Sequence, residues 1–147
     1  MLVYLDMCCL KRPFDDQSQP RIRLEAEAVL MVLARESAEL RFVRSTALLL
    51  ENAFNPLPER SARVGHWLRS GTMWQPADAA QLEARVAEWI GLGLRNFDAL
   101  HIATAEQATA DRFVTVDDHL LAALRRHGAH CRVPVRGVLE LAQEVST

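Results

Sequence analysis

The sequence predicts an α/β protein with three layers, α/β/α, in which helices cover both faces of a mostly parallel sheet. Short apolar runs that are rich in strand-forming residues alternate with longer segments whose apolar residues recur at helical spacing. Strands that are separated by helices pair in parallel, and the helices then pack on the two faces of the sheet. A chain of 147 residues fits one domain, residues 1–147, around one core.

In the first two thirds of the chain, turn and cap residues mark where the elements begin and end. Asp6 ends the first apolar run, Ser45 or Thr46 is placed to cap a helix that carries Glu51, and Pro56 and Pro58 end that helix. The expected elements are a strand at 2–5, a polar loop at 11–20, a helix at 22–38, a strand at 40–43, helices at 46–55 and 59–69, a short strand at 72–75 and an amphipathic helix at 79–90.

The last third has the clearest boundaries. Asn96 is expected to cap an alanine-rich helix, Asp117 and Asp118 open another helix, and Gly128 follows it as a C-cap residue. The expected elements here are a helix at 97–108, a turn and strand at 111–116, a helix at 119–127, a strand at 131–135 and a helix at 137–145.

Composition and charge narrow the functional classes. The net charge is −2, so a broad cationic surface for nucleic acid is excluded, and any such contact must be local. The three cysteines, Cys8, Cys9 and Cys131, show no disulfide spacing and fit a reducing compartment. On a strand, Cys8 and Cys9 would point to opposite faces as small core residues. No apolar run reaches membrane-spanning length, so we expect a cytoplasmic protein without membrane contact.

Four acidic residues lie where a site is expected to form. Asp6 and Asp117 end strands, and ligands in open α/β sheets bind outside the carboxyl ends of strands. Glu51 and Asp98 lie in helices that can border the same edge. Each acid alone has an ordinary structural explanation, such as helix capping for Asp117 or a favourable helix dipole for Asp98. Together, on four separate elements, they offer the hard oxygen donors that Mg²⁺ and Mn²⁺ prefer.

The same residues carry a resemblance to a known family. Val3-Tyr4-Leu5-Asp6, Leu49-Leu50-Glu51, the segment from Asp98 to Ala103 and the segment from Phe113 to Asp117 resemble, in order and context, the acidic quartet of PIN domains. The loop from Arg12 to Gln17 is similar to a loop in one bacterial branch of that family. The resemblance covers nearly the whole chain. It implies a Rossmann-like sheet with a metal-dependent nuclease centre that acts on RNA.

The resemblance also implies partners. Many stand-alone bacterial members of this length are toxins of the VapC type, which pair with a small antitoxin protein. Toxins of this kind commonly pair through helices near the first half of the chain, so a homodimer is expected.

If the four acids converge, each has an expected role. Asp6, Asp98 and Asp117 would hold one or two Mg²⁺ or Mn²⁺ ions directly or through water, and Glu51 would orient the attacking water or accept its proton. Thr115 and Ser45 are candidate hydrogen-bond donors that fix carboxylate rotamers, or equally an ordinary strand threonine and a helix cap. Arg12 and Arg95 are candidates for RNA phosphate contacts, although surface arginines are usually only solvated.

Two positions depart from the family pattern. Cys8 stands two residues after the first Asp, where the family often has Asn, Ser or Thr, so a group that helps to hold water is missing. Asp117 and Asp118 are adjacent, where the family usually has one Asp. The register favours Asp117 as the ligand and leaves Asp118 as a capping residue or as part of a second, weaker cation site.

Three other interpretations account for parts of the sequence. A non-catalytic PIN-like assembly module would not need all four acids, but Cys8 leaves this alternative open. A phosphoacceptor receiver domain would need paired acids near the first strand and a late lysine, whereas the only lysine is Lys11. A zinc site at His127, His130 and Cys131 lacks a fourth ligand at suitable spacing.

Overall fold

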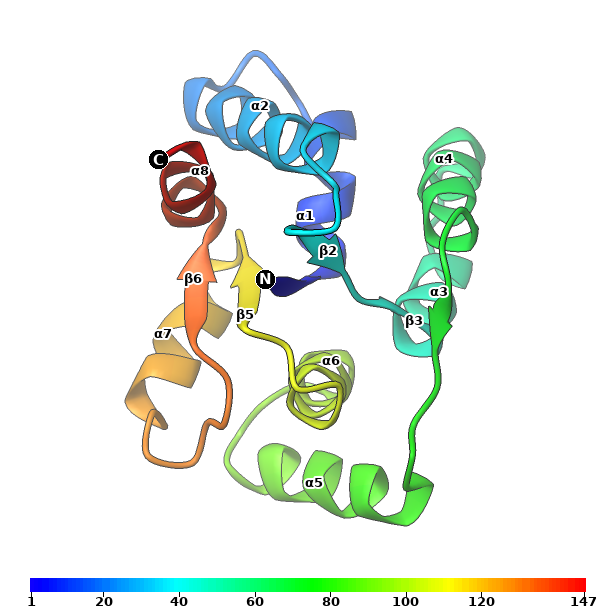
Figure 1. Cartoon of the computed structure of the whole chain (residues 1–147), viewed down its shortest axis with the longest axis vertical. Coiled ribbons are helices and arrows are strands. Elements are labelled where there is room, and N and C mark those ends of the chain that lie inside the picture. Colours follow the sequence, from blue (N-terminus) through cyan, green and yellow to red (C-terminus); the bar gives the residue numbers. More distant parts are fainter.

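The computed structural model describes residues 1–147 and has a central parallel sheet between layers of helices (Figure 1). The sheet has four strands in the order β2-β1-β5-β6, and every neighbouring pair is parallel. This arrangement confirms the predicted α/β class and the parallel sheet. The four strands are β1 (Leu2–Leu5), β2 (Arg41–Phe42), β5 (Arg112–Thr115) and β6 (Val135–Gly137).

Helices cover both faces of this sheet. Helices α2 and α8 lie together on one side, and α5 and α6 lie on the other side (Figure 1). The helices are α1 (Met7–Lys11), α2 (Pro20–Ala34), α3 (Thr46–Ala53), α4 (Pro58–Arg69), α5 (Ala79–Gly91), α6 (Asn96–Gln107), α7 (Asp118–Arg126) and α8 (Val138–Ser146), with a 3-10 turn, η1 (Arg12–Phe14), after α1. No helix is both long enough and apolar enough to cross a bilayer.

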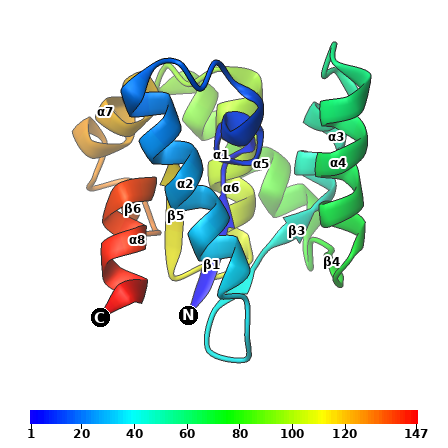
Figure 2. The ribbon, with the colours of Figure 1, turned by 90° about the horizontal axis from the view of Figure 1, so that it is seen from above.

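A second, two-stranded sheet lies beside the main one, next to α3 and α4 (Figure 2). Its strands are β3 (Arg44–Ser45) and β4 (Met73–Trp74), which pair in parallel. The strand expected at 72–75 therefore exists, but it does not extend the central sheet. Because β3 leads directly into α3, this small sheet fixes where the helix that carries Glu51 begins.

The register of β1 and β5 brings distant parts of the sequence together. Leu5 pairs with Val114, and the backbone amide of Asp6 donates to the Val114 carbonyl at 2.9 Å. Tyr4 and Phe113 stack on these strands with ring centroids 5.6 Å apart, and both are fully buried. The carboxyl ends of β1 and β5 therefore lie side by side, with Asp6 and Asp117 just beyond them.

Helix caps explain several boundaries. Ser45 Oγ accepts from the amide of Leu48 at the start of α3, and Asp117 Oδ1 accepts from the amides of His119 and Leu120 at the start of α7. Both caps agree with the sequence-based expectation. The expected cap at Asn96 is wrong, since Asn96 is the first residue of α6 and Arg95 precedes it without a side-chain cap.

Two other expectations are corrected. Cys8 and Cys9 do not lie on a strand but in α1, a five-residue helix that begins directly after Asp6. The last strand begins at Val135, not at Cys131. The reason for the second difference is that the backbone before Val135 bonds to side chains: the amide of Arg132 donates to Glu106 Oε2 at 2.8 Å, and the His130 carbonyl accepts from Arg85.

Candidate functional site

One cleft at the carboxyl ends of β1 and β5 collects the four acids singled out in the sequence. Its volume is about 340 Å³. Each acid comes from a different place in the fold: Asp6 follows β1, Glu51 lies in α3, Asp98 in the first turn of α6, and Asp117 follows β5. The other lining residues are Cys8, Lys11, Arg95, Asn96 and Phe97.

Asp6 is held in one orientation by donors on both of its oxygens. Oδ1 accepts from the backbone amide of Met7 at 2.8 Å, which makes Asp6 the N-cap of α1. Oδ2 accepts from Thr115 Oγ1 at 2.9 Å and from Cys8 Sγ at 3.2 Å. The residue is only 4% exposed. Three donors around a buried carboxylate fix its rotamer, so Thr115 has the contact expected for an orienting donor.

Cys8 occupies the position where the family pattern often has a hydroxyl or an amide. Its Sγ lies 3.2 Å from Asp6 Oδ2 and 3.2 Å from Thr115 Oγ1. A hydrogen bond with Cys9, burial and the charge of Asp6 raise the pKa of the Cys8 thiol well above its usual value. The thiol therefore keeps its proton at neutral pH and donates it to Asp6, whereas Cys9 packs in the core as expected.

Asp117 and Asp118 have separate partners despite being neighbours. Asp117 caps α7 and lies in the cleft, and its own backbone amide donates to Thr115 Oγ1 at 3.1 Å. Asp118 forms a paired contact with Arg21, at 2.7 and 2.8 Å, on the exposed surface. This pairing lowers the pKa of Asp118. Asp118 thus ties α7 to α2 and does not line the cleft.

Asp98 shows the electrostatic cost of gathering the acids. Its pKa is raised to about 6, first by burial and then by the negative charges of Asp6 and Asp117, while the positive charge of Arg95 opposes the rise. The carboxyl group therefore titrates near neutral pH when no cation is bound. Like charges that crowd a half-buried cleft favour a bound cation that would neutralise them.

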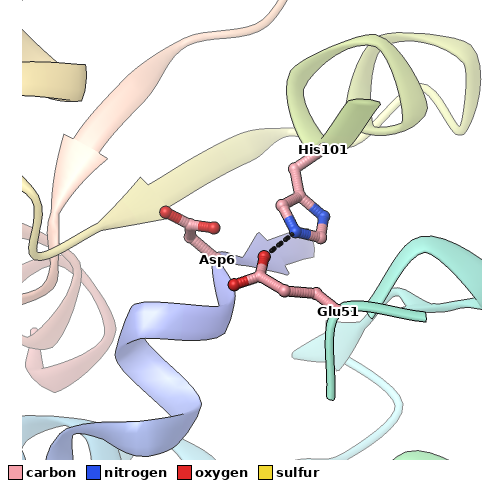
Figure 3. Close-up of side chains that lie close together, drawn as sticks. All are labelled: Asp6, Glu51 and His101. Carbon is pink, nitrogen blue, oxygen red and sulfur yellow. Dashed lines mark hydrogen bonds and ion pairs between the residues drawn. The ribbon is translucent and has the colours of Figure 1, made fainter. Parts of the chain in front are cut away.

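Glu51 is bound to a histidine that the sequence reasoning did not identify. Its Oε1 lies 2.6 Å from His101 Nε2, and Figure 3 shows this contact beside Asp6. The ring is fully buried, and its Nδ1 lies 2.7 Å from the Tyr4 hydroxyl. His101 follows Asp98 by three residues in α6, so the two share one helix face; this spacing is the signal that could have identified the histidine.

The ligand atoms of three residues come especially close. One oxygen each from Asp6 and Glu51 and a ring nitrogen of His101 all lie within 4.8 Å of one another. Ser45, a candidate either for fixing a carboxylate or for capping a helix, caps α3 and contacts no carboxylate; its Oγ lies 2.9 Å from the Tyr4 hydroxyl. It therefore acts on Glu51 only through Tyr4 and His101.

Among solved structures, the chain is similar to a chain of "VapBC-1 from nontypeable Haemophilus influenzae". The superposition has a TM-score of 0.64, covers 95% of this chain and 99% of that chain, and has 14% sequence identity. This match spans the whole architecture. The chain has a PIN-like fold. No protein-family model matches it, and no curated protein matches it.

In this PIN-like fold, the loop from Arg12 to Gln17 is closed by its own contacts. The Gln17 amide donates to the carbonyls of Arg12 and Asp15, at 3.0 and 2.8 Å. The Arg12 guanidinium pairs with Asp15 at 3.0 Å and with the buried Glu25 at 3.2 Å. The guanidinium of Arg12 is therefore paired with carboxylates of the fold. Of the two candidate phosphate-binding arginines, only Arg95 lines the cleft.

His127, His130 and Cys131, the candidate zinc ligands, are not arranged as a zinc site in this fold. The rings of His127 and His130 have centroids 6.2 Å apart, and Cys131 Sγ donates to the Val133 carbonyl. These three residues are not among the groups whose ligand atoms lie close enough to share an ion, whereas the ligand atoms of Asp6, Glu51 and His101 lie within 4.8 Å of one another.

Proposed function

We propose that this protein is a metal-dependent endoribonuclease, a hydrolase of RNA phosphodiester bonds built as a single domain over residues 1–147. One observation carries the proposal: four carboxylates from four separate elements line one cleft of a PIN-like fold. A set of solvated surface acids would not be half-buried, oriented by donors and crowded enough to raise the pKa of Asp98.

The donor set fits Mg²⁺ or Mn²⁺. Carboxylate oxygens are the ligands that these hard cations prefer, and both ions usually keep several waters. In the proposal, Asp6, Asp98 and Asp117 hold the ion, and Glu51 contributes directly or through water. When bound, the cation supplies Lewis acidity that activates water and neutralises charge on the phosphate.

The residues of the chain provide the rest of the chemistry. Water adds to phosphorus while one ester P–O bond breaks. The proton that the water loses passes to an acceptor in the cleft, and the departing ester oxygen takes up a proton from solvent. Glu51 is the proposed acceptor, because its side chain is only 23% exposed and one of its oxygens is already held by His101. Thr115 and Cys8 hold Asp6 in a fixed orientation throughout.

RNA contacts in the proposal are local. Arg95 and Lys11 line the cleft beside the acids and can bind phosphate oxygens, and Phe97 offers a ring for a base to stack on. This arrangement agrees with a net charge of −2, which excludes a broad cationic surface. The acidic cleft itself attracts RNA only once the cation has neutralised part of its charge.

We further propose that the protein is the toxin of a toxin–antitoxin pair, with a small protein antitoxin as its partner, and that it acts in the cytoplasm, where its RNA substrate is found. The support is the similarity to a chain of VapBC-1 over nearly the full length of both chains.

We expect a homodimer, because helices in the first half of the chain expose large apolar side chains. Leu50, Phe54 and Leu57 lie at α3 and the turn before α4, and they are 52%, 72% and 51% exposed. Burying such side chains against a second copy removes apolar surface from water. Light scattering at micromolar concentration should give twice the mass of the chain. A monomer at that concentration would remove the homodimer without affecting the catalytic proposal.

RNA digestion tests the proposed activity directly. The purified protein should cleave single-stranded RNA internally when Mg²⁺ or Mn²⁺ is present, and a chelator should stop cleavage until excess cation is restored. A non-catalytic PIN-like assembly module, the alternative interpretation, predicts no cleavage under any of these conditions. Cleavage that continues in the presence of the chelator would also contradict the proposal.

A further inference from the structure

A chain of four hydrogen bonds starts and ends in helix α3. The backbone amide of Leu48 donates to Ser45 Oγ at 3.2 Å, and Ser45 Oγ lies 2.9 Å from the Tyr4 hydroxyl. That hydroxyl lies 2.7 Å from His101 Nδ1, and His101 Nε2 lies 2.6 Å from Glu51 Oε1. The chain thus passes from α3 through β1 and α6 and returns to Glu51.

Only one placement of the protons satisfies every group in this chain. Ser45 Oγ already accepts from Leu48, so it is free to donate its own proton to Tyr4. Tyr4 then donates to His101 Nδ1, which must be unprotonated. The remaining imidazole proton lies on Nε2 and points at Glu51 Oε1. Each hydroxyl then accepts one hydrogen bond and donates one, each ring nitrogen has one partner, and every donor is directed along the chain toward Glu51.

The opposite placement leaves a buried donor without a partner. If His101 carried a proton on Nδ1, Tyr4 would have to accept it and donate to Ser45 instead. Ser45 Oγ would then accept from both Leu48 and Tyr4, and none of its partners could accept its own proton. Ser45 and Tyr4 are both fully buried, so water cannot replace the missing acceptor.

We propose that His101 is a positioning residue that donates its Nε2–H to Glu51 Oε1 and is not a metal ligand. As a consequence, Glu51 faces the cleft with Oε2 alone. The meaning of this consequence for a cation rests on the proposed function. In Figure 3 one oxygen of Glu51 is bonded to the ring and the other points away from it. A hydrogen-bond donor of this kind fixes the rotamer of a carboxylate and leaves a single oxygen free for an ion or a water molecule.

The consequence concerns which cations the site accepts. The ring nitrogen of His101 lies within 4.8 Å of oxygens of Asp6 and Glu51, a spacing that would suit an ion between them. Imidazole ligands favour Zn²⁺, Ni²⁺ or Cu²⁺, whereas carboxylates alone favour Mg²⁺ and Mn²⁺. A proton held on Nε2 by the chain from Ser45 keeps the nitrogen out of the ligand set. The site then offers oxygen donors only.

Nitrogen-15 NMR of the histidine side chains tests the assignment on the metal-free protein. His101 is the only one of the five histidines that is fully buried, so its N–H should exchange slowly with solvent and be distinguishable. The expected spectrum shows Nε2 protonated and Nδ1 unprotonated. The same pattern should persist after addition of Mg²⁺ or of Zn²⁺. A proton on Nδ1, or loss of the Nε2 proton with either ion, would overturn the proposal.

A variant pair tests the consequence for the cation site. Tyr4→Phe keeps the ring that stacks on Phe113 and removes only the hydroxyl that holds His101. Loss of the hydroxyl loosens His101, the hydrogen-bond partner of Glu51, so the Mg²⁺ concentration for half-maximal thermal stabilisation should rise roughly tenfold. Thr104→Val is the matched control, because it removes a buried hydroxyl of α6 that bonds only to the Leu100 carbonyl.

The outcomes separate this proposal from the proposed function. Equal Mg²⁺ requirements in Tyr4→Phe and Thr104→Val would overturn the positioning role of His101. A wild-type protein whose melting temperature does not respond to Mg²⁺ or Mn²⁺ would overturn the proposed function, and the NMR pattern would still decide which ring nitrogen carries the proton.

Discussion

Asp98→Asn should lower RNA cleavage by on the order of 100-fold or more, since losing even an outer partner of a metal ligand costs roughly 10- to 100-fold. A neutral amide is a poorer donor for a hard cation, so the stabilisation by Mg²⁺ or Mn²⁺ should weaken in parallel. The metal-free variant should be no less stable than the wild type at neutral pH, because one of the mutually repelling charges in the cleft is gone.

The same variant should remove a pH dependence of stability. Burial, with the charges of Asp6 and Asp117, raises the pKa of Asp98 to about 6 in the folded protein, from an ordinary value of 3.8. The charged form is thus disfavoured by folding, so the wild type loses stability as the pH rises above about 4, and the loss is complete above about 6. Allowing for solvent around the half-buried side chain, it amounts to about 1 kcal/mol. Melts of both proteins without divalent cation, from pH 4 to 7, give the difference.

Asp118→Asn is the control for Asp98→Asn. Asp118 is also an acid in the first turn of a helix, but it pairs with Arg21 on the surface and does not line the cleft. Cleavage and the metal response should survive this change. If Asp98 served only the helix dipole, Asp98→Asn would instead lose roughly 0.3–1 kcal/mol of stability and keep its activity. That result would contradict the site assignment.

Glu106→Ala should destabilise the protein by about 3–5 kcal/mol, the range seen when one partner of a buried ion pair is removed. The side chain of Glu106 in α6 is 3% exposed and accepts two hydrogen bonds from Arg85 at 2.8 Å, one from Trp89 Nε1 and one from the amide of Arg132. Burial alone would raise the pKa of Glu106, but these donors outweigh it and hold the pKa below its usual value. Urea unfolding gives the free energy directly.

Glu88→Ala is the matched control, because it removes the other carboxylate that binds Arg85. The Glu88 side chain is 58% exposed, so solvent screens its 2.7 Å contact with Arg85. Its loss should cost less than about 1 kcal/mol. Equal losses in the two variants would show that burial of Glu106 contributes nothing to the stability of this corner of the fold.

The elements that carry the cleft could be predicted from the sequence because their signals are local. Short apolar runs between segments of helical spacing predict β1 and β5, and Asp6 and Asp117 follow these strands in the sequence. Parallel pairing then requires that these two side chains lie at the same edge. Ser45 and Asp117 are cap residues whose bonds reach only three residues along the chain, so they too are visible in the sequence.

The features that could not be predicted are either too short to show a pattern or depend on partners far away in the sequence. Helix α1 has only five residues, which is too short for a helical period to appear. The role of His101 depends on Tyr4 and Glu51, which lie 97 and 50 residues from it. The start of β6 depends on Glu106 and Arg85, whose side chains hold the preceding backbone away from the sheet.

The strand order has a consequence for synthesis of the protein. β5 pairs directly with β1 and lies between β1 and β6, although 106 residues of the chain separate Leu5, where β1 ends, from Arg112, where β5 begins. The first 95 residues contain only Asp6 and Glu51 of the four cleft acids, and Asp98 and Asp117 arrive with α6 and β5. A chain that has been translated only as far as residue 95 therefore has two of the four cleft carboxylates and an incomplete sheet. The finished cleft forms only when the last third of the polypeptide has left the ribosome and β5 has inserted beside β1.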